Sequence, residues 1–396
     1  MARRNAIFAL VSAAMFIDMM MYTLVVPILP IYSKSLGADQ FTVGVIFGVF
    51  SVALLLCGIP LGMLSDRIGR RPLMVAGMFL MGLATIVFTF SGSLYMLILA
   101  RIVQGISGAA TWSAGLALIA DTFDASERGS RLGMAIAIMA AGTTTGPVVG
   151  GLVYDHLGYR MAFVLPAMLA IGMCATFLAI TVPPRLQSAK SDYGKVLGKA
   201  PLALVTCSVA TVVGAMTYGV MEPFMPLFLV QKFSAALTAS TMSTTIGLAF
   251  AAMSLLNMVA APIMGKLYDR FGGRALLASG LILSGLIFAA TMAMPAMWST
   301  ILVFSLLGIT MSMGLTPMLP LLTDLFGGSE NGSGGFIYGI YNTLFSAGLA
   351  IGSLIGGMLV TRLDFPATVL IQAVLLALTG VAFFAVVRDR ASAVHK

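Results

Sequence analysis

The sequence predicts an all-α membrane protein with twelve transmembrane helices in two pseudo-symmetric six-helix bundles. Three observations lead to this expectation: few charged residues, a length that suits twelve spans, and an internal repeat. Of the 396 residues, 59% are hydrophobic and 9% are charged, whereas about 25% of the residues in a soluble domain are charged. So few charged side chains cannot cover a water-facing surface, and most of the exterior must therefore face lipid.

Apolar segments of spanning length follow one another along the chain with short connections. Each span needs roughly 20 apolar residues, so twelve spans of about 24 residues use roughly 290 residues and leave no room for a soluble domain. We expect the spans at residues 6–32, 41–63, 73–91, 94–120, 131–154, 161–182, 200–230, 240–263, 275–294, 297–322, 336–360 and 366–387.

The sixth connection differs from the others in composition. It begins with Pro183-Pro184-Arg185 and contains three lysines. We interpret residues 183–199 as a cytoplasmic linker between an N-terminal bundle, residues 1–182, and a C-terminal bundle, residues 200–396.

Three motifs of the first half return in the second half at offsets of 196, 203 and 206 residues. The repeated segments are Pro27–Pro30 with Pro223–Pro226, Gly62–Gly69 with Gly265–Gly272, and Gly142–Gly151 with Gly348–Gly357. Parallel repeats related by an axis along the membrane normal are typical of transporters whose substrate site lies at mid-membrane between the repeats.

The distribution of basic residues predicts the orientation of the chain. Of the 22 Lys and Arg residues, 17 fall on one set of alternating segments, and the opposite loops carry only Lys34, Arg160, Lys232 and Arg362. By the positive-inside rule both termini are cytoplasmic, and we expect a multi-pass protein of the cell (inner) membrane. The same distribution explains the net charge of +8 without a nucleic-acid partner.

The sequence contains no pattern typical of an enzyme or a metal site. The three cysteines, Cys57, Cys174 and Cys207, all fall within apolar spans, where a thiol is usually a small core residue. The two histidines lie in a loop and at the C-terminal end. We therefore expect no metal, no cofactor and no catalytic activity.

Two carboxylates interrupt the apolar spans. Of the 14 acidic residues, twelve fall in loops or at span ends, whereas Asp18 lies in the first span and Glu222 in the seventh. A carboxylate in a low-dielectric cavity tends to keep its proton, and a cationic substrate beside it would expel that proton. Two alternatives are structural: Asp18 pairs with Arg101, or Glu222 accepts a hydrogen bond from broken-helix backbone beside Pro223.

Arg101 begins the segment Arg101-Ile-Val-Gln104-Gly105 in the fourth span. An arginine two turns into an apolar helix costs several kcal/mol unless it is paired or hydrated. We expect it to face the protein interior, the alternative being a side chain that extends towards the membrane interface.

The loop after the second span reads Gly62-Met-Leu-Ser-Asp66-Arg67-Ile-Gly69-Arg70. It resembles the loop signature of the major facilitator superfamily, and the fourth-span arginine resembles the arginine that this family links to proton transfer. The resemblance implies the major facilitator fold and a loop that acts as a conformational latch. Asp66 has two candidate partners, a helix N-terminus and Arg70.

The fifth span carries the residues Gly142, Gly146, Pro147, Gly150 and Gly151. Small residues at every fourth position form a groove that lets a neighbouring helix pack closely, and Pro147 removes one helical hydrogen bond. The segment resembles the antiporter signature of the drug:proton exporters, although small residues at this spacing are also common in ordinary helix packing.

The sequence around both buried acids resembles the first and seventh helices of vesicular monoamine transporters. In those relatives the first-helix Asp contacts the substrate ammonium, and the seventh-helix Glu lies in the same cavity. Where they have a Lys in the second helix and acids in the tenth and eleventh, this chain has Phe50, Ser312 and Asn342. Coupling to protons is therefore expected to depend on Asp18, Glu222 and Arg101.

The resulting hypothesis is a monomeric, proton-coupled antiporter of organic cations such as monoamines and lipophilic cationic drugs, driven by the proton gradient. A transporter of neutral metabolites or sugars is the alternative. Aromatic rings near the acids can make cation–π contacts. The candidate substrate-binding residues are Asp18, Glu222, Tyr22, Tyr218, Asn342, Tyr338, Tyr341 and Phe345.

Overall fold

The structure is a computed structural model that describes residues 2–180, 201–236, 238, 240–325 and 334–387. Within these ranges it contains fourteen helices and no strand. The helices are α1 (Ala2–Leu24), α2 (Leu29–Ser35), α3 (Gln40–Ile68), α4 (Arg70–Phe90), α5 (Leu94–Thr122), α6 (Ala125–Leu157), α7 (Tyr159–Ala179), α8 (Pro201–Lys232), α9 (Met242–Phe271), α10 (Arg274–Ala293), α11 (Met297–Leu315), α12 (Met318–Leu325), α13 (Gly334–Arg362) and α14 (Phe365–Val386).

The twelve expected spans are confirmed within the described part of the chain, where twelve helical segments are long and apolar enough to cross a membrane. The end of the first span was wrong, because the spanning segment is Arg3–Leu24, whereas the tenth segment, Met297–Thr323, agrees with the expected bounds but contains a break. The first expected span, 6–32, is interrupted by a turn at residues 25–28, and the tenth, 297–322, is interrupted between Leu315 and Met318. A proline lies in each break, Pro27 and Pro317, and a proline has no backbone N–H to continue the helical ladder. The expected linker at 183–199 lies outside the described residues.

Short polar sequences begin several helices. The carboxylate of Asp39 accepts the backbone N–H of Thr42 at 2.7 Å and thereby caps α3, and the hydroxyl of Ser93 accepts that of Met96 to cap α5. Gly69 joins α3 directly to α4 with a φ of 96°. A residue with a side chain rarely adopts this left-handed conformation, so the glycine permits the sharp turn between the two spans.

The packing divides the chain into two compact units. The first contains Met1–Gln187 with Glu222–Ala251, and the second contains Ser188–Met221 with Ala252–Lys396. We refer to them as unit 1 and unit 2. The last part of α8 and the first part of α9 therefore pack with the N-terminal helices, and Glu222 belongs to the same unit as Asp18.

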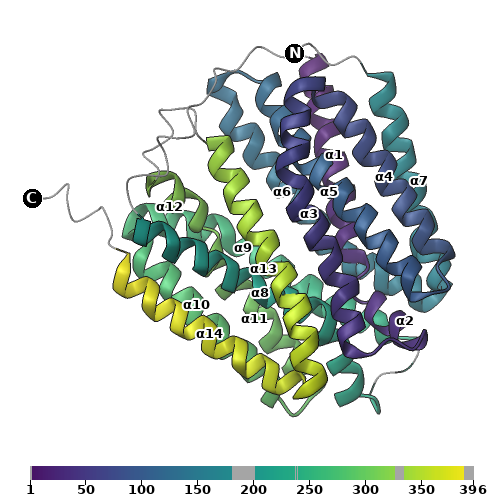
Figure 1. Ribbon diagram of the computed structural model, residues 1–396, viewed down its shortest axis with the longest axis vertical. Helices are drawn as coiled ribbons and strands as arrows, with labels where there is room; N and C mark the ends of the chain where they lie inside the picture. The colour runs from purple at the N-terminus through teal and green to yellow at the C-terminus, as the bar shows by residue number, and fades with distance from the viewer. Residues whose placement is uncertain (1, 181–200, 237, 239, 326–333, 388–396) are drawn as a thin grey trace, which may run out of the picture. The chain divides into compact units, whose positions relative to one another are not determined.

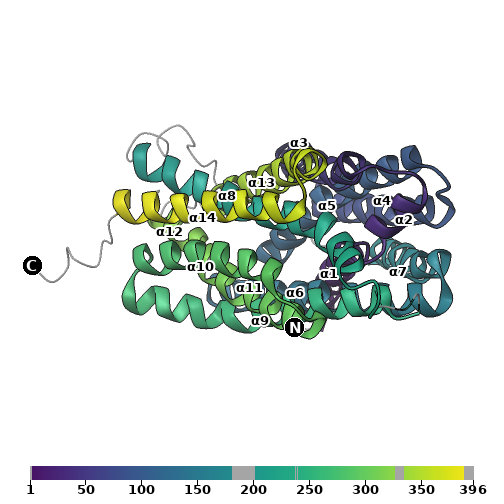
Figure 2. The same cartoon turned by 90° about the horizontal axis from the view of Figure 1, so that it is seen from below.

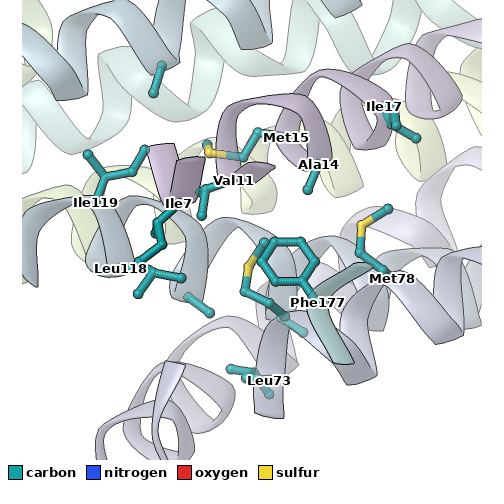
Figure 3. Close-up of a cluster of buried hydrophobic side chains, with 14 of the residues drawn as sticks. Ile7, Val11, Ala14, Met15, Ile17, Leu73, Met78, Leu118, Ile119 and Phe177 are labelled. Atoms are coloured by element: carbon teal, nitrogen blue, oxygen red, sulfur yellow. The ribbon is translucent and has the colours of Figure 1, made fainter. Parts of the chain in front are cut away.

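In unit 1, α1 packs against α4, α5, α6 and α7, and Figures 1 and 2 show it running among these helices. Its first half lies in an apolar cluster with α4, α5 and α7 (Figure 3). The labelled members of this cluster are Ile7, Val11, Ala14, Met15, Ile17, Leu73, Met78, Leu118, Ile119 and Phe177. This core holds the helix that carries Asp18 in a fixed position.

Three glycines of the fifth span face the second half of α1, whereas Gly151 faces the start of α9. A Cβ atom added at Gly142 would meet the carbonyl oxygen of Phe16, and one added at Gly146 would meet that of Met20. A Cβ at Gly150 would meet the carbonyl oxygen of Leu24. Lipid gives apolar helices no hydrophobic driving force to associate, so close van der Waals packing of this kind holds them together. The predicted groove is therefore present, and the helix that fills it is α1.

In unit 2, α10 packs against α11 and α14, and α13 packs against α12 and α14. The first part of α8 lies against α13. A Cβ added at Gly348 would meet the carbonyl oxygen of Val212, and one added at Gly352 would meet that of Met216. The α8–α13 crossing in unit 2 therefore uses glycines in the same way as the α1–α6 crossing in unit 1.

Candidate substrate and proton site

Asp18 lies on α1 and is almost completely buried, with 1% of its surface exposed. Its Oδ2 atom accepts a hydrogen bond from the indole Nε1 of Trp112 on α5 at 2.6 Å. Its Oδ1 atom is buried and has no hydrogen-bond partner among the described residues. A buried carboxylate oxygen without a donor is costly, so this atom is ready to accept an N–H from a ligand. Pairing with Arg101, the structural alternative for Asp18, does not occur.

Glu222 lies on α8, with 9% of its surface exposed. Its carboxylate accepts a hydrogen bond from the hydroxyl of Tyr22 at 2.7 Å. Helix α8 continues unbroken past Pro223, so the expected alternative of a bond to broken-helix backbone is also wrong. Tyr22 is one turn beyond Asp18 on α1. The hydrogen bond from Tyr22 therefore holds Glu222 against the same stretch of helix that carries Asp18.

Arg101 on α5 is 1% exposed, which rules out the alternative in which it extends to the interface. Its guanidinium donates to Gln104 Oε1 at 2.7 Å and to the carbonyl oxygen of Ile46 at 3.3 Å. No ion pair of Arg101 is found within the described residues. Its charge is instead enclosed by aromatic rings.

Three rings surround the Arg101 guanidinium. Its Cζ atom lies 4.4 Å from the ring centre of Phe50, 5.1 Å from that of Phe47 and 5.7 Å from that of Tyr22. Such contacts are worth about 2 kcal/mol or more when they are desolvated. Phe50 also stacks on Tyr22, with centroids 4.8 Å apart. Phe50 therefore contributes to the cage around Arg101, and Tyr22 links this cage to Glu222.

The remaining candidate binding residues belong to unit 2. The rings of Tyr218 and Phe345 lie 6.0 Å apart, and those of Tyr341 and Phe345 lie 6.1 Å apart. The amide of Asn257 donates to the hydroxyl of Tyr218 at 3.5 Å. These contacts bring three of the predicted aromatic residues into one cluster. Asn342 lies on the same helix, α13, and is partly buried, whereas the side chain of Tyr338 lies outside the described residues.

The predicted latch loop contains an ion-pair network at the end of unit 1. Arg70 contacts Asp66 at 2.6 Å and Asp121 of α5 at 3.1 Å, and it donates to the hydroxyl of Ser65. Of the two candidate partners of Asp66, the structure therefore shows Arg70. Gly62 lies close to Ser113 of α5, and Arg67 is exposed. The loop thus ties α3, α4 and α5 together.

Sequence reasoning missed two residues with polar roles. Trp112 holds Asp18. Helical spacing could have indicated this residue, because Arg101, Gln104, Gly108 and Trp112 share one face of α5. Asp155, which we counted among the acids in loops or at span ends, accepts the backbone N–H groups of Ser243 and Thr244 at 3.2 and 2.7 Å. It caps the N-terminus of α9 from the end of α6, a contact between distant segments that local sequence does not reveal.

Comparison with known proteins identifies the family. The sequence profile described as Major Facilitator Superfamily matches residues 11–243 and 207–396, and the chain belongs to this family. The MFS-type transporter SLC18B1 of Rattus norvegicus is 26% identical over 400 residues, which cover 96% of this chain and 86% of that protein. The chromaffin granule amine transporter of Homo sapiens is 29% identical over 342 residues, and the match covers 84% of this chain but only 63% of the relative.

A solved structure shows the same fold. The bacterial homologue of the human lysosomal transporter Spinster, in an inward-facing and occupied conformation, superimposes with a TM-score of 0.85. The alignment covers 99% of this chain and 98% of that chain at 15% sequence identity. The protein is therefore a multi-pass membrane transporter with the major facilitator fold.

Proposed function

We propose that the protein exchanges organic cations, such as monoamines and lipophilic cationic drugs, for protons by alternating access. The observation that carries this proposal is Asp18, whose carboxylate is buried, held through one oxygen by a neutral indole donor, and unpartnered at the other oxygen among the described residues. Either a proton or an ammonium group can satisfy that oxygen, but not both at once. Competition between them is sufficient to couple the two fluxes.

Two further observations support exchange of a cation. Glu222 is a second buried carboxylate in the same unit, attached through Tyr22 to the helix that carries Asp18. Arg101 offers a fixed positive charge that repels a cationic substrate unless a carboxylate is ionised, which favours loss of a proton before the substrate binds. The similarity to amine transporters agrees with this substrate class.

The proposed location is the cell membrane, with both termini in the cytoplasm, a monomeric state and no cofactor. Four basic residues gather at one end of unit 1. Arg4 pairs with Asp124, Arg70 pairs with Asp121, Arg71 binds the carbonyl oxygens at the end of α7, and Arg131 lies over Phe123. This arrangement matches the positive-inside rule, by which this end of unit 1 faces the cytoplasm. The orientation can be tested by introducing single cysteines at this end and measuring their reaction with a membrane-impermeant reagent.

The test is binding and proton-driven uptake of radiolabelled 2-phenylethylamine by the purified protein and by proteoliposomes. We expect Asp18→Asn to abolish binding, because an amide carries no charge to pair with the ammonium. Asp39→Asn is the matched control, since Asn also caps a helix, and it should bind normally. Normal amine affinity in Asp18→Asn would refute the proposal, and saturable uptake of neutral sugars instead would favour the alternative substrate class.

Glu222 is proposed as a second proton or cation site. If it exchanges protons, Glu222→Gln should change the pH dependence of uptake or the number of protons moved per amine. Measuring the reversal potential at several pH gradients gives that number directly. An unchanged ratio would leave Glu222 a purely structural role, namely to hold Tyr22.

A further inference from the structure

Trp112 leaves Asp18 with two unequal oxygen atoms. The indole N–H points at Oδ2 from 2.6 Å, a short hydrogen bond of the charge-assisted type. Oδ1 is equally buried but receives no hydrogen bond within the described part of the chain. The carboxylate is therefore a monodentate acceptor, because only one of its oxygens remains available to a ligand.

The indole that binds this carboxylate lies in an apolar cluster. Trp112 packs against a cluster formed by Met19, Tyr22, Phe50 and Leu54, together with the adjoining Met139. Methionine and aromatic side chains adapt to apolar ligand groups of varied shape. A ligand that donates to Oδ1 would thus place the rest of its body against an apolar wall.

We propose that Trp112 is a positioning residue that makes the site selective for ammonium ions with at least one N–H over guanidinium and quaternary ammonium ions. The inference rests on the proposed function, in which Asp18 receives the substrate cation. An ammonium group needs only one acceptor oxygen. A guanidinium binds a carboxylate best through two parallel N–H···O bonds, one to each oxygen, and the indole occupies the second place.

A quaternary ammonium ion fails for a different reason. It has no N–H, so it can neutralise the charge of Asp18 but cannot give Oδ1 a hydrogen bond. The oxygen would stay buried and unsatisfied, which is costly. The expected order of affinity is therefore the primary amine first, the guanidine second, and the quaternary ion last.

The experiment uses three probes with the same phenylethyl body: 2-phenylethylamine, 2-phenylethylguanidine and trimethyl(2-phenylethyl)ammonium. Their dissociation constants are measured on the purified full-length protein and on Trp112→Phe, which keeps the ring but removes the donor. Loss of the indole hydrogen bond frees Oδ2, so we expect the ratio of guanidine to amine affinity to rise about tenfold. Trp112→Gln, which restores an N–H donor, should return the ratio towards the native value.

The chain supplies a matched control. It has two tryptophans, and the other one, Trp298, is 71% exposed on α11. Trp298→Phe should leave all three affinities unchanged. It also makes Trp112 the single indole of the protein, so that its fluorescence reports on the Asp18 carboxylate and should respond when 2-phenylethylamine binds.

Three outcomes separate the two proposals. If Trp112→Phe weakens all probes in parallel with the ratio unchanged within about twofold, Trp112 is only structural and this inference is overturned. If Trp112→Phe does not bind any probe, the test is the Trp112 fluorescence of the Trp298→Phe variant. Fluorescence that does not change at saturating 2-phenylethylamine overturns the inference about Trp112. If Asp18→Asn keeps native amine affinity, the proposed function itself fails, whatever the ratio shows.

Discussion

Two helix crossings of this protein share their backbone geometry but differ in chemistry. In unit 1, Gly142 and Gly146 of α6 lie on the carbonyl oxygens of Phe16 and Met20, and in unit 2, Gly348 and Gly352 of α13 lie on those of Val212 and Met216. The paired positions keep the repeat offsets of 206 and 196 residues. The sequence repeat thus corresponds to a repeated mode of packing inside each unit.

Several side chains around these crossings differ between the two copies. The offset of 196 residues aligns Tyr22 with Tyr218 but Asp18 with Gly214. The first crossing therefore carries an acid at a position where the second carries a glycine. Pro147 is matched by Ser353, whose hydroxyl donates to the carbonyl oxygen of Gly219 at 3.0 Å. The comparison shows that both copies use the same close packing of helices, whereas the acid of the first crossing, Asp18, has no counterpart at the aligned position of the second.

The largest effect is expected from filling the grooves. Gly146→Leu and Gly352→Leu each force a side chain into helix backbone, and overpacking of this kind typically costs about 1–3 kcal/mol. We expect Gly146→Leu to slow proton-driven amine uptake at least about tenfold, with the dissociation constant changed less than about threefold. Its effect should exceed that of Gly352→Leu, because the adjacent Pro147 also packs against Gly247 of α9.

Uptake and equilibrium binding have to be measured in the same preparation for both variants. Gly146→Ala provides a milder step in the same series. Transport at the native rate in Gly146→Leu would mean that the fifth-span glycines serve ordinary packing, and the comparison with drug:proton exporters would lose its support.

Exchanging the residues that differ between the crossings should separate stability from transport. Ser353→Pro removes a helical N–H and the hydroxyl bond to Gly219, and a proline in a helix interior costs about 3 kcal/mol or more. Pro147→Ser restores an N–H and should leave stability unchanged or raised, but it should slow exchange if transport needs the helical hydrogen bond that Pro147 removes. Thermal unfolding in detergent, followed by uptake, would show both effects, and equal stability losses in the two variants would contradict the comparison.

The two aligned tyrosines should also behave differently. Tyr22 donates to a carboxylate at 2.7 Å, whereas Tyr218 is contacted by the amide of Asn257 at 3.5 Å. Hydrogen bonds to charged groups contribute about 1.5–3 kcal/mol, so Tyr22→Phe should change the pH profile of uptake and Tyr218→Phe should not. If the pH profile of uptake is the native one in both variants, Tyr22 has no part in proton coupling.

The smallest effect is expected at the loops after the second and eighth spans. Gly69 and Gly272 both have positive φ, and Arg71 and Arg274 both bind carbonyl oxygens near the end of the last helix of their half. Arg70, however, is replaced by Gly273, so the second loop lacks the arginine at the centre of the ion-pair network in the first loop.

Arg70→Gly or Asp66→Ala should therefore shift the population of conformations. Partly exposed ion pairs contribute up to about 1 kcal/mol, which corresponds to about a fivefold shift. Spectroscopic distance distributions between labels on the cytoplasmic side would detect it, with amine affinity as the control. Unchanged distributions would contradict a latch role for this loop.

The sequence alone determined the features that depend on local composition. Hydropathy located all twelve spans within the described part of the chain, because spanning a membrane requires a continuous apolar helix whatever its neighbours are. Spacing identified the glycine groove and the repeats. The scarcity of intramembrane charge singled out Asp18, Glu222 and Arg101, because a charge is kept in such a place only for a reason.

Only the tertiary structure decided which groups meet. The partners of the three buried charges are Trp112, Tyr22 and a cage of aromatic rings. Trp112 lies 94 positions from Asp18 along the chain, and Tyr22 lies 200 positions from Glu222. Periodicity predicts the face on which a side chain lies, but not the helix that covers that face. The monodentate state of Asp18 depends on the rotation of α5 against α1, which is a property of packing and not of either helix alone.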